Sequence, residues 1–262
     1  MKTLDFYNIK IIETPTSIEI WEYTEKPIFY AINNTHKKNT LNENNIHEKK
    51  EEKTSDIYDK IKRKQKHYNK MRWEIARIID CNFDDSTKFM TLTFKENITD
   101  IEYTNKEFNK FIKRLNYKIY KTKKSQLKYL AVWEKQKRGA IHYHIIFFDF
   151  PYIKNKELTD IWGHGFVKIN KIDVDSKDNR GRYVSKYFSK DIDIKTYKQK
   201  AFFKSQNLKL PEINLLKIEH ELNLSGENVV YTKTYTRKSP EFNNSGLEFT
   251  DSLVKYTKIR KE

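Results

Sequence analysis

Cysteine, glycine and long apolar runs are scarce in this 262-residue sequence, and each shortage excludes a class of protein. Cys81 is the single cysteine, which excludes an internal disulfide and a cysteine-based zinc site. None of the six glycines belongs to a GxxxxGK[ST] loop, which excludes an ATPase module of that type. No apolar run approaches the ~20 residues that a membrane-spanning helix needs, and Met1–Lys10 lacks the apolar core of a signal peptide. We therefore expect a soluble, cytoplasmic protein without membrane contact.

Basic residues are abundant, and they are concentrated in two segments. The formal net charge of +16 indicates a polyanionic partner, either nucleic acid or an acidic membrane surface. Residues 57–77 carry eight basic against two acidic side chains, and residues 105–128 carry nine against one. Lysine enrichment from an AT-biased gene would scatter the charge more evenly. The clustering therefore favours a focused basic surface of the kind that contacts phosphates.

The chain divides into four stretches by composition. Alternating apolar residues predict a β-hairpin in residues 1–30, which we assign to the same unit as the central region. Residues 31–56 are almost free of apolar side chains, which predicts a linker or insertion. Residues 57–192 form the core unit. Residues 193–262 form a strand-containing extension, with strand character at Val229–Tyr235.

The core unit alternates strand and helix patterns. A first helix is predicted by a stripe of Tyr68, Met71, Ile75, Ile78 and Ile79. The elements expected after it are a strand at Phe89–Phe94, a helix opened by a capping box at Thr104–Glu107 and carrying Phe108, Phe111, Ile112, Leu115 and Ile119, strands at Leu127–Glu134 and Ile141–Phe148 around a turn at Lys137–Gly139, a short helix at Leu158–Trp162, a strand at Phe166–Ile172 and a helix at Arg180–Asp191. This order is typical of an α+β fold with helices against an antiparallel sheet.

The sharpest motif is His142-Tyr143-His144. Side chains two apart in a strand point to the same side, so both imidazoles share a face. A hairpin folded about residue 138 places Glu134 opposite His142 on that face. Two imidazoles and one carboxylate suit a divalent ion such as Mn²⁺, with Mg²⁺ as a physiological substitute, and leave positions for a phosphate oxygen. The alternative is a pair of exposed histidines without a ligand role, which the facing Glu134 makes less favourable.

A second motif places two phenols and two ammonium groups on one stripe of a helix. Tyr183, Lys186, Tyr187 and Lys190 fall at i, i+3, i+4 and i+7. A phenol with a pKa near ~10 is a weak nucleophile at neutral pH, so it needs a neighbouring lysine or a metal-polarised electrophile. The alternative is an ordinary surface helix whose tyrosines are half-buried.

These motifs, in this order, resemble the HUH endonuclease superfamily, in particular the replication initiators of rolling-circle plasmids and small phages. Thr91–Phe94 resembles the first family motif, Glu134 with Arg138–His144 the second, and Tyr183–Lys190 the third, here doubled as YxxKYxxK. Trp162–Val167 is also similar to what plasmid and phage members carry. The resemblance covers roughly residues 70–190.

The resemblance implies a fold and a reaction. The fold is a five-stranded antiparallel sheet of RRM-like, ferredoxin-like topology, with the histidines on a central strand and the tyrosine helix over it. Glu134, His142 and His144 would hold the metal. A tyrosine would attack the scissile phosphate, form a 5′-phosphotyrosyl adduct and free a 3′-hydroxyl. We favour Tyr183 as the first nucleophile, oriented by Lys186, and whether Tyr187 also acts stays open.

The implied partners are single-stranded origin DNA and a separate helicase and polymerase. The basic side chains assigned to the DNA interface are Lys60, Lys62, Arg63, Lys64, Lys66, Lys70, Arg72, Lys110, Lys113, Arg114, Lys118, Arg138, Arg180 and Arg182. His164 is interpreted as a loop residue, and Trp133 and Trp162 as core residues.

Two other functions fit the same residues. A transposase or mobilisation nuclease would share every site residue and differ in the DNA that it recognises. A catalytically silent nucleic-acid-binding module would use the same sheet without the chemistry.

Overall fold

The computed structural model describes residues 6–29, 54–172, 202–220, 222–243 and 246–261. The chain forms two compact units. One unit contains Lys64–Leu210, and the other combines the residues up to Arg63 with those from Pro211 onward. In the described residues, no helix combines the length and the apolar character that crossing a bilayer requires.

The unit Lys64–Leu210 is built on a five-stranded sheet in the order β8-β5-β7-β6-β9. Its strands are β5 (Lys88–Thr93), β6 (Lys128–Lys135), β7 (Ile141–Phe148), β8 (Val167–Lys171) and β9 (Phe203–Lys204). Every neighbouring pair is antiparallel. With α2 (Ile101–Tyr120) and α3 (Asn155–Trp162), the elements β5 to β8 follow the β-α-β-β-α-β order of ferredoxin-like folds. The histidine-bearing strand β7 is the central one.

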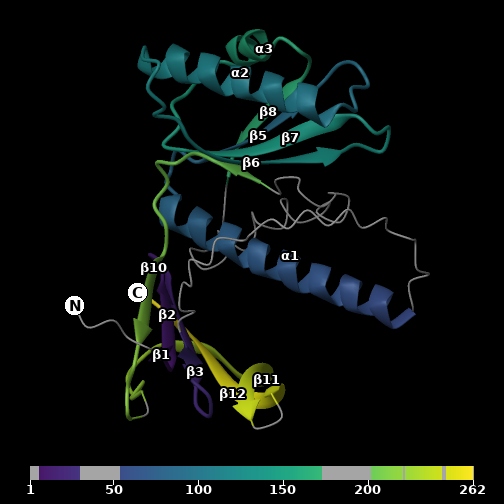
Figure 1. Ribbon diagram of the computed structural model, residues 1–262. Helices are drawn as coiled ribbons and strands as arrows, with labels where there is room; N and C mark the ends of the chain where they lie inside the picture. Colours follow the sequence, from purple (N-terminus) through teal and green to yellow (C-terminus); the bar gives the residue numbers. More distant parts are fainter. Residues whose placement is uncertain (1–5, 30–53, 173–201, 221, 244–245, 262) are drawn as a thin grey trace. The chain divides into compact units, whose positions relative to one another are not determined.

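Helices cover both faces of this sheet (Figure 1). On one face, the predicted stripe of α2 is buried together with Trp133 and Tyr143 of the sheet and Trp162 of α3. On the other face, the predicted stripe of α1 (Thr54–Asn82) is buried against Leu130 and Ile146. Both stripes are confirmed where the side chains are described, and Tyr68 lies outside that set. The placement of Trp133 and Trp162 in the core is also confirmed, with exposed fractions of 2% and 0%.

The start of α2 differs from the prediction. The helix begins at Ile101, and the side chain of Asp100 accepts hydrogen bonds from the backbone N–H groups of Glu102 (2.8 Å) and Tyr103 (3.1 Å). Thr104 and Glu107 therefore lie inside the helix, and both are buried. The predicted capping box is wrong because Asp100, four residues earlier, already satisfies the free N–H groups at the helix start.

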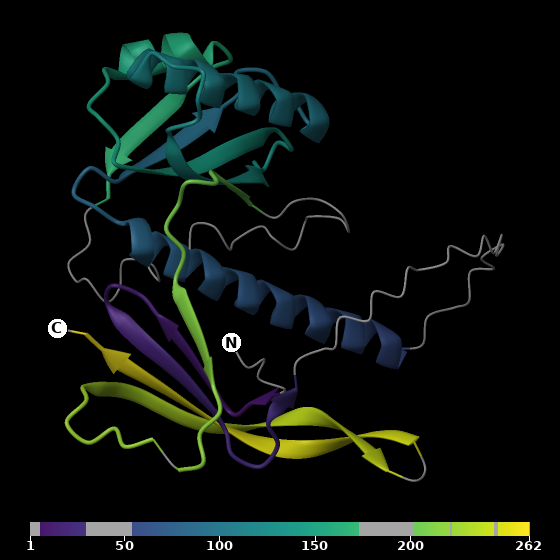
Figure 2. The ribbon, with the colours of Figure 1, turned by 60° about the vertical axis from the view of Figure 1, so that its left-hand side comes forward.

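The second unit contains another five-stranded sheet, in the order β10-β2-β3-β12-β11. Its strands are β2 (Ile9–Glu13), β3 (Ser17–Tyr23), β10 (Glu212–Leu216), β11 (Val229–Asn243) and β12 (Gly246–Arg260), and a separate pair joins β1 (Phe6–Tyr7) to β4 (Ile28–Phe29). Figure 2 shows the purple β2–β3 hairpin beside the yellow β12. Ile9, Ile20 and Ile259 form the centre of its small core.

The N-terminal hairpin is present, but its partners differ from the expected ones. We assigned residues 1–30 to the central unit, whereas β2 pairs with β10 and β3 pairs with β12. Both outer edges of the hairpin therefore receive their hydrogen bonds from the C-terminal stretch. The predicted linker, residues 31–56, lies outside the described residues except for its last three, which begin α1.

Candidate active site

Three candidate metal ligands come together on two neighbouring strands. Glu134 of β6 lies directly opposite His142 of β7, which confirms the predicted register. One carboxylate oxygen of Glu134, Oε1, is hydrogen-bonded to Nε2 of His142 and to Nε2 of His144, the latter at 2.8 Å. The ligand atoms all lie within 4.8 Å of one another. The three side chains thus converge on one point and form a possible metal-binding site.

The three side chains lie in a half-buried position, with exposed fractions of 12%, 15% and 19% for His142, His144 and Glu134. Burial alone would raise the pKa of the Glu134 carboxyl. The hydrogen bonds and positive charge of His142 and His144 outweigh it and hold that pKa well below its usual value. Glu134 is therefore a carboxylate at neutral pH, which is the form that binds metal ions.

Strand β5 orients His144 from the side. Thr91 lies opposite His144 in the sheet, and its hydroxyl is 3.1 Å from Nδ1 of the imidazole. The ring of Phe89 stacks on the same imidazole, with ring centres 5.4 Å apart. Because Nδ1 is engaged by Thr91, Nε2 is the nitrogen that faces Glu134. Such outer partners fix the tautomer and direction of a ligating histidine.

The sequence interpretation missed these roles of Phe89 and Thr91. It placed Thr91 in a family motif but did not derive its contact with His144. A usable signal was present, because side chains at positions 89, 91 and 93 share one face of β5. That face becomes the histidine face only once the pairing of β5 with β7 is known.

The segment after α3 anchors the end of β5 beside the site. The indole N–H of Trp162 donates to the carbonyl of Thr93 (3.1 Å), and the N–H of Thr93 donates to the carbonyl of Phe166 (2.9 Å). Thr93 lies opposite His142. At Gly165 a Cβ atom would lie 2.5 Å from the Thr93 carbonyl oxygen, so only glycine fits there. This packing explains the glycine in the Trp162–Val167 motif.

His164 does not join the three ligands. Its Nε2 is 2.9 Å from a carboxylate oxygen of Glu107, on α2. The other oxygen of Glu107 accepts a hydrogen bond from the Lys110 ammonium at 2.7 Å. His164 therefore ties its loop to α2, as expected for a loop residue.

The donor set fits a borderline divalent cation. Two imidazole nitrogens and one carboxylate oxygen suit Mn²⁺, Zn²⁺ or Fe²⁺, and also accept Mg²⁺ when further oxygen ligands are supplied. Three protein ligands leave positions for a substrate oxygen. A fully closed structural site would use four protein ligands.

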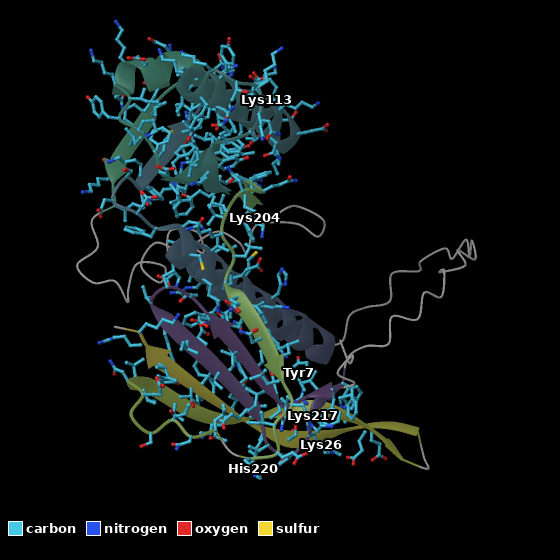
Figure 3. The ribbon with its side chains drawn as sticks, turned by 90° about the vertical axis from the view of Figure 1, so that its left-hand side faces the viewer. Tyr7, Lys26, Lys113, Lys204, Lys217 and His220 are labelled. Atoms are coloured by element: carbon cyan, nitrogen blue, oxygen red, sulfur yellow. The ribbon has the colours of Figure 1, made fainter. Side chains whose placement is uncertain are left out.

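The basic residues predicted on α2 lie across the sheet from the three ligands. His142 and His144 share the face of β7 that carries Ile146, which packs against α1, whereas α2 covers the other face. Three of the four predicted α2 cations also have protein partners. Lys110 pairs with Glu107, Arg114 donates to the carbonyls of Ile161 and Trp162, and Lys118 pairs with Glu157. Lys113 is exposed on α2 (Figure 3).

The basic residues of α1 and of the β6–β7 turn are arranged differently. Lys62, Lys66 and Lys70 are exposed and Arg72 is half-buried, while the side chains of Lys60, Arg63 and Lys64 lie outside the described set. Arg138 donates to the Phe94 carbonyl (2.8 Å) and the Lys95 carbonyl (3.4 Å), which holds the turn against the end of β5.

The tyrosine motif lies outside the described residues. These predictions, for which the structure gives no position, concern Arg180, Arg182, Tyr183, Lys186, Tyr187 and Lys190.

Comparison with known proteins matches the part of the chain that carries the site. Residues 87–192 match the family model of the ORF2 type of replication-associated protein. The chain is similar to replication-associated proteins. This matched segment includes Glu134, His142 and His144 as well as the tyrosine motif.

A curated relative has a related description. The phasyl DNA replicon protein arp of Escherichia coli is 28% identical over 157 residues, which are 50% of this chain and 53% of the relative. The chain thus spans about half the length of this relative. No solved structure matches the chain significantly.

Proposed function

We propose that this protein initiates rolling-circle replication by nicking and rejoining single-stranded DNA at an origin. The observation that carries the proposal is the convergence of Glu134, His142 and His144 within a segment similar to replication-associated proteins. A carboxylate and two imidazoles would hold Mn²⁺ or Mg²⁺, which supplies positive charge to a bound phosphate oxygen. The resemblance of the motifs to HUH endonucleases supports the same assignment.

The chemistry is a transesterification at phosphorus. The phenol oxygen of Tyr183 forms a bond to the scissile phosphorus, and the bond from phosphorus to the 3′ oxygen breaks. The phenol loses its proton, and the departing 3′ oxygen gains one and becomes a hydroxyl that primes synthesis. Lys186 orients the phenol and stabilises its anionic form. One ester replaces another, so the energy needed for rejoining stays in the phosphotyrosyl bond.

The second tyrosine provides a route to rejoining. Tyr187 attacks the newly made junction after a round of replication, and the released 3′-hydroxyl then attacks the first phosphotyrosyl bond. This cycle consumes no nucleotide, which agrees with the lack of a GxxxxGK[ST] loop in the sequence. Strand separation and synthesis require a separate helicase and polymerase.

The test is formation of a covalent protein–DNA adduct. The protein is incubated with Mn²⁺ and labelled single-stranded DNA, and SDS-resistant adducts are separated by electrophoresis. We expect an adduct with the unaltered chain and with Tyr183→Phe or Tyr187→Phe alone, and none with the double variant. An adduct that persists in the double variant would refute the nucleophile assignment. DNA binding without any adduct would favour the non-catalytic binding module.

A further inference from the structure

The two faces of the second sheet carry different chemistry. Directly opposed residues of neighbouring strands lie on the same face, so the register sorts the side chains. One face carries Ile9, Ile20 and Ile259, whose cluster is completed by Ile11, Ile18, Ile218, Leu222 and Leu224. The register places aromatic and basic side chains on the other face.

A row of alternating charge and aromatic rings crosses that other face. Lys10 of β2, Trp21 of β3, Tyr256 of β12 and Lys233 of β11 lie directly opposite one another in turn. The Lys10 ammonium is 5.5 Å from the Trp21 ring centre, and the Trp21 and Tyr256 rings are 5.0 Å apart. Two neighbouring aromatic side chains thus lie between two cations.

The same pattern continues along the edge strand β11. Tyr231 and Tyr235 lie two residues on either side of Lys233, so the three side chains share a face. Tyr231 is 51% exposed and Tyr235 is 39% exposed, and Lys233 is exposed as well. The Tyr231 ring lies 6.0 Å from that of Tyr256, which joins this strand to the aromatic row. Exposed phenol rings therefore flank an exposed ammonium group.

The acidic residue beside this row does not offset its charge at the surface. Glu19 of β3 is 4% exposed, and one of its carboxylate oxygens accepts a hydrogen bond from the Tyr256 hydroxyl at 3.1 Å. Lys258 of β12 lies opposite Glu19 and, through the register, on the same face as Tyr231. The exposed part of the face around Lys233 is thus aromatic and positively charged.

We propose that this face of the second sheet, centred on Tyr231, Lys233 and Tyr235, binds single-stranded DNA. Aromatic rings stack with unpaired bases, and ammonium groups interleaved with them contact the backbone phosphates. A duplex keeps its bases paired and stacked, so it offers these rings no base faces. The surface belongs to a different compact unit from the three candidate metal ligands. It binds DNA whether or not the other unit cuts DNA.

The test compares two faces of one strand in the full-length protein. Tyr231→Ala with Tyr235→Ala removes the two exposed rings, and Thr232→Ala with Thr234→Ala alters exposed residues on the opposite face of β11. Binding to a fluorescein-labelled oligothymidylate is measured by anisotropy with EDTA present, so that metal-dependent cleavage does not contribute. We expect about ten-fold weaker binding for the tyrosine pair, as loss of base stacking predicts, and no change for the threonine pair.

Two further variants separate stacking from charge and from folding. Tyr231→Phe with Tyr235→Phe keeps both rings, so we expect it to retain the affinity of the unaltered chain. Lys233→Ala removes one phosphate contact, so the slope of log affinity against log salt falls by about 0.7. Melting temperatures of all variants identify any that fail to fold.

Cross-linking gives an independent location. Irradiation of the protein with a bromodeoxyuridine oligonucleotide should yield cross-linked peptides from Val229–Asn243. Unchanged affinity in the tyrosine pair, an equal loss in the threonine pair, or tighter binding to a duplex of the same sequence would each overturn the proposal. The tyrosine-motif adduct assay plays no part in this test, so either proposal can fail alone.

Discussion

The two five-stranded sheets are both antiparallel, but they differ in what covers them. The sheet of Lys64–Leu210 has helices on both faces, and its central residues Met90, Tyr143 and Ile146 are fully buried. The sheet of the second unit has a small isoleucine core on one face, and its edge strand β11 exposes aromatic rings. The first construction fixes a few polar side chains in a rigid setting. The second displays a broad surface.

This difference explains where fixed geometry is found. Phe89, Thr91 and Thr93 pack beside the histidines, and each is held by a paired strand or by the segment after α3. A metal site needs such positioning, because its ligand atoms must meet within a few tenths of an ångström. Base stacking on an exposed strand tolerates looser placement, because every base offers a flat face.

Loss of a metal ligand should give the largest effect and should be confined to the first sheet. We expect His142→Ala to lower adduct formation by more than about 100-fold, because a lost ligand should cost more than the loss of a side chain that only orients a ligand. Adduct assays and titration calorimetry with Mn²⁺ measure the two steps. His164→Ala is the matched control, because His164 contacts Glu107 instead. Equal Mn²⁺ binding in both variants would contradict the assignment.

Thr91 should affect metal affinity without being a ligand. We expect Thr91→Val to weaken Mn²⁺ binding about 10- to 100-fold, because His144 loses the partner that fixes its tautomer. Thr91→Ser keeps a hydroxyl and should retain most of the affinity. Calorimetry measures the change directly, without relying on cleavage. A result in which serine and valine behave alike would mean that packing, and not the hydroxyl, supports His144.

Core truncations should separate the two sheets by stability. Ile146→Ala in the first sheet should reduce the free energy of unfolding by about 4 kcal/mol, because Ile146 is fully enclosed. Ile259→Ala in the second sheet should cost about 2 kcal/mol, because the smaller core around it can collapse. Urea denaturation followed by circular dichroism gives both values. The reverse order would show that the second sheet is the better packed one.

The smallest expected effect concerns acid sensitivity. The hydrogen bond from Lys110, followed by the contact with His164, outweighs burial and lowers the pKa of Glu107 below its ordinary 4.5. A lowered folded-state pKa adds stability that is present above the ordinary value and is lost as the pH falls through the folded value. Glu107→Gln should therefore melt slightly lower than the unaltered chain at pH 7, and lose less on acidification. Melting curves from neutral pH down to the acid range check this.

Local patterns predicted much of the first sheet. The alternation of β7 and the turn at Lys137–Gly139 were sufficient to place Glu134 opposite His142, because both signals lie close together in the sequence. The apolar stripes of α1 and α2 were equally readable. The charge of α2 was also correct, but charge alone does not reveal which side of the sheet a helix covers.

Contacts between distant segments could not be predicted in the same way. The pairing of β3 with β12 joins the two ends of the chain, and neither strand carries a local mark of its partner. The contact between Thr91 and His144 likewise depends on the register of β5 against β7. The capping error at Thr104 has another cause, since Asp100 and Thr104 are both good caps and only the structure shows which one the helix uses.

The single oxygen of Glu134 that bridges both imidazoles has a consequence for how a cation would arrive. The carboxylate and the two rings already restrain one another, so the ligand set keeps its shape without an ion to template it. Uptake then requires only that the hydrogen-bond partners yield to the incoming cation, with little rearrangement of the backbone. We expect such a site to exchange its ion readily between successive encounters with DNA.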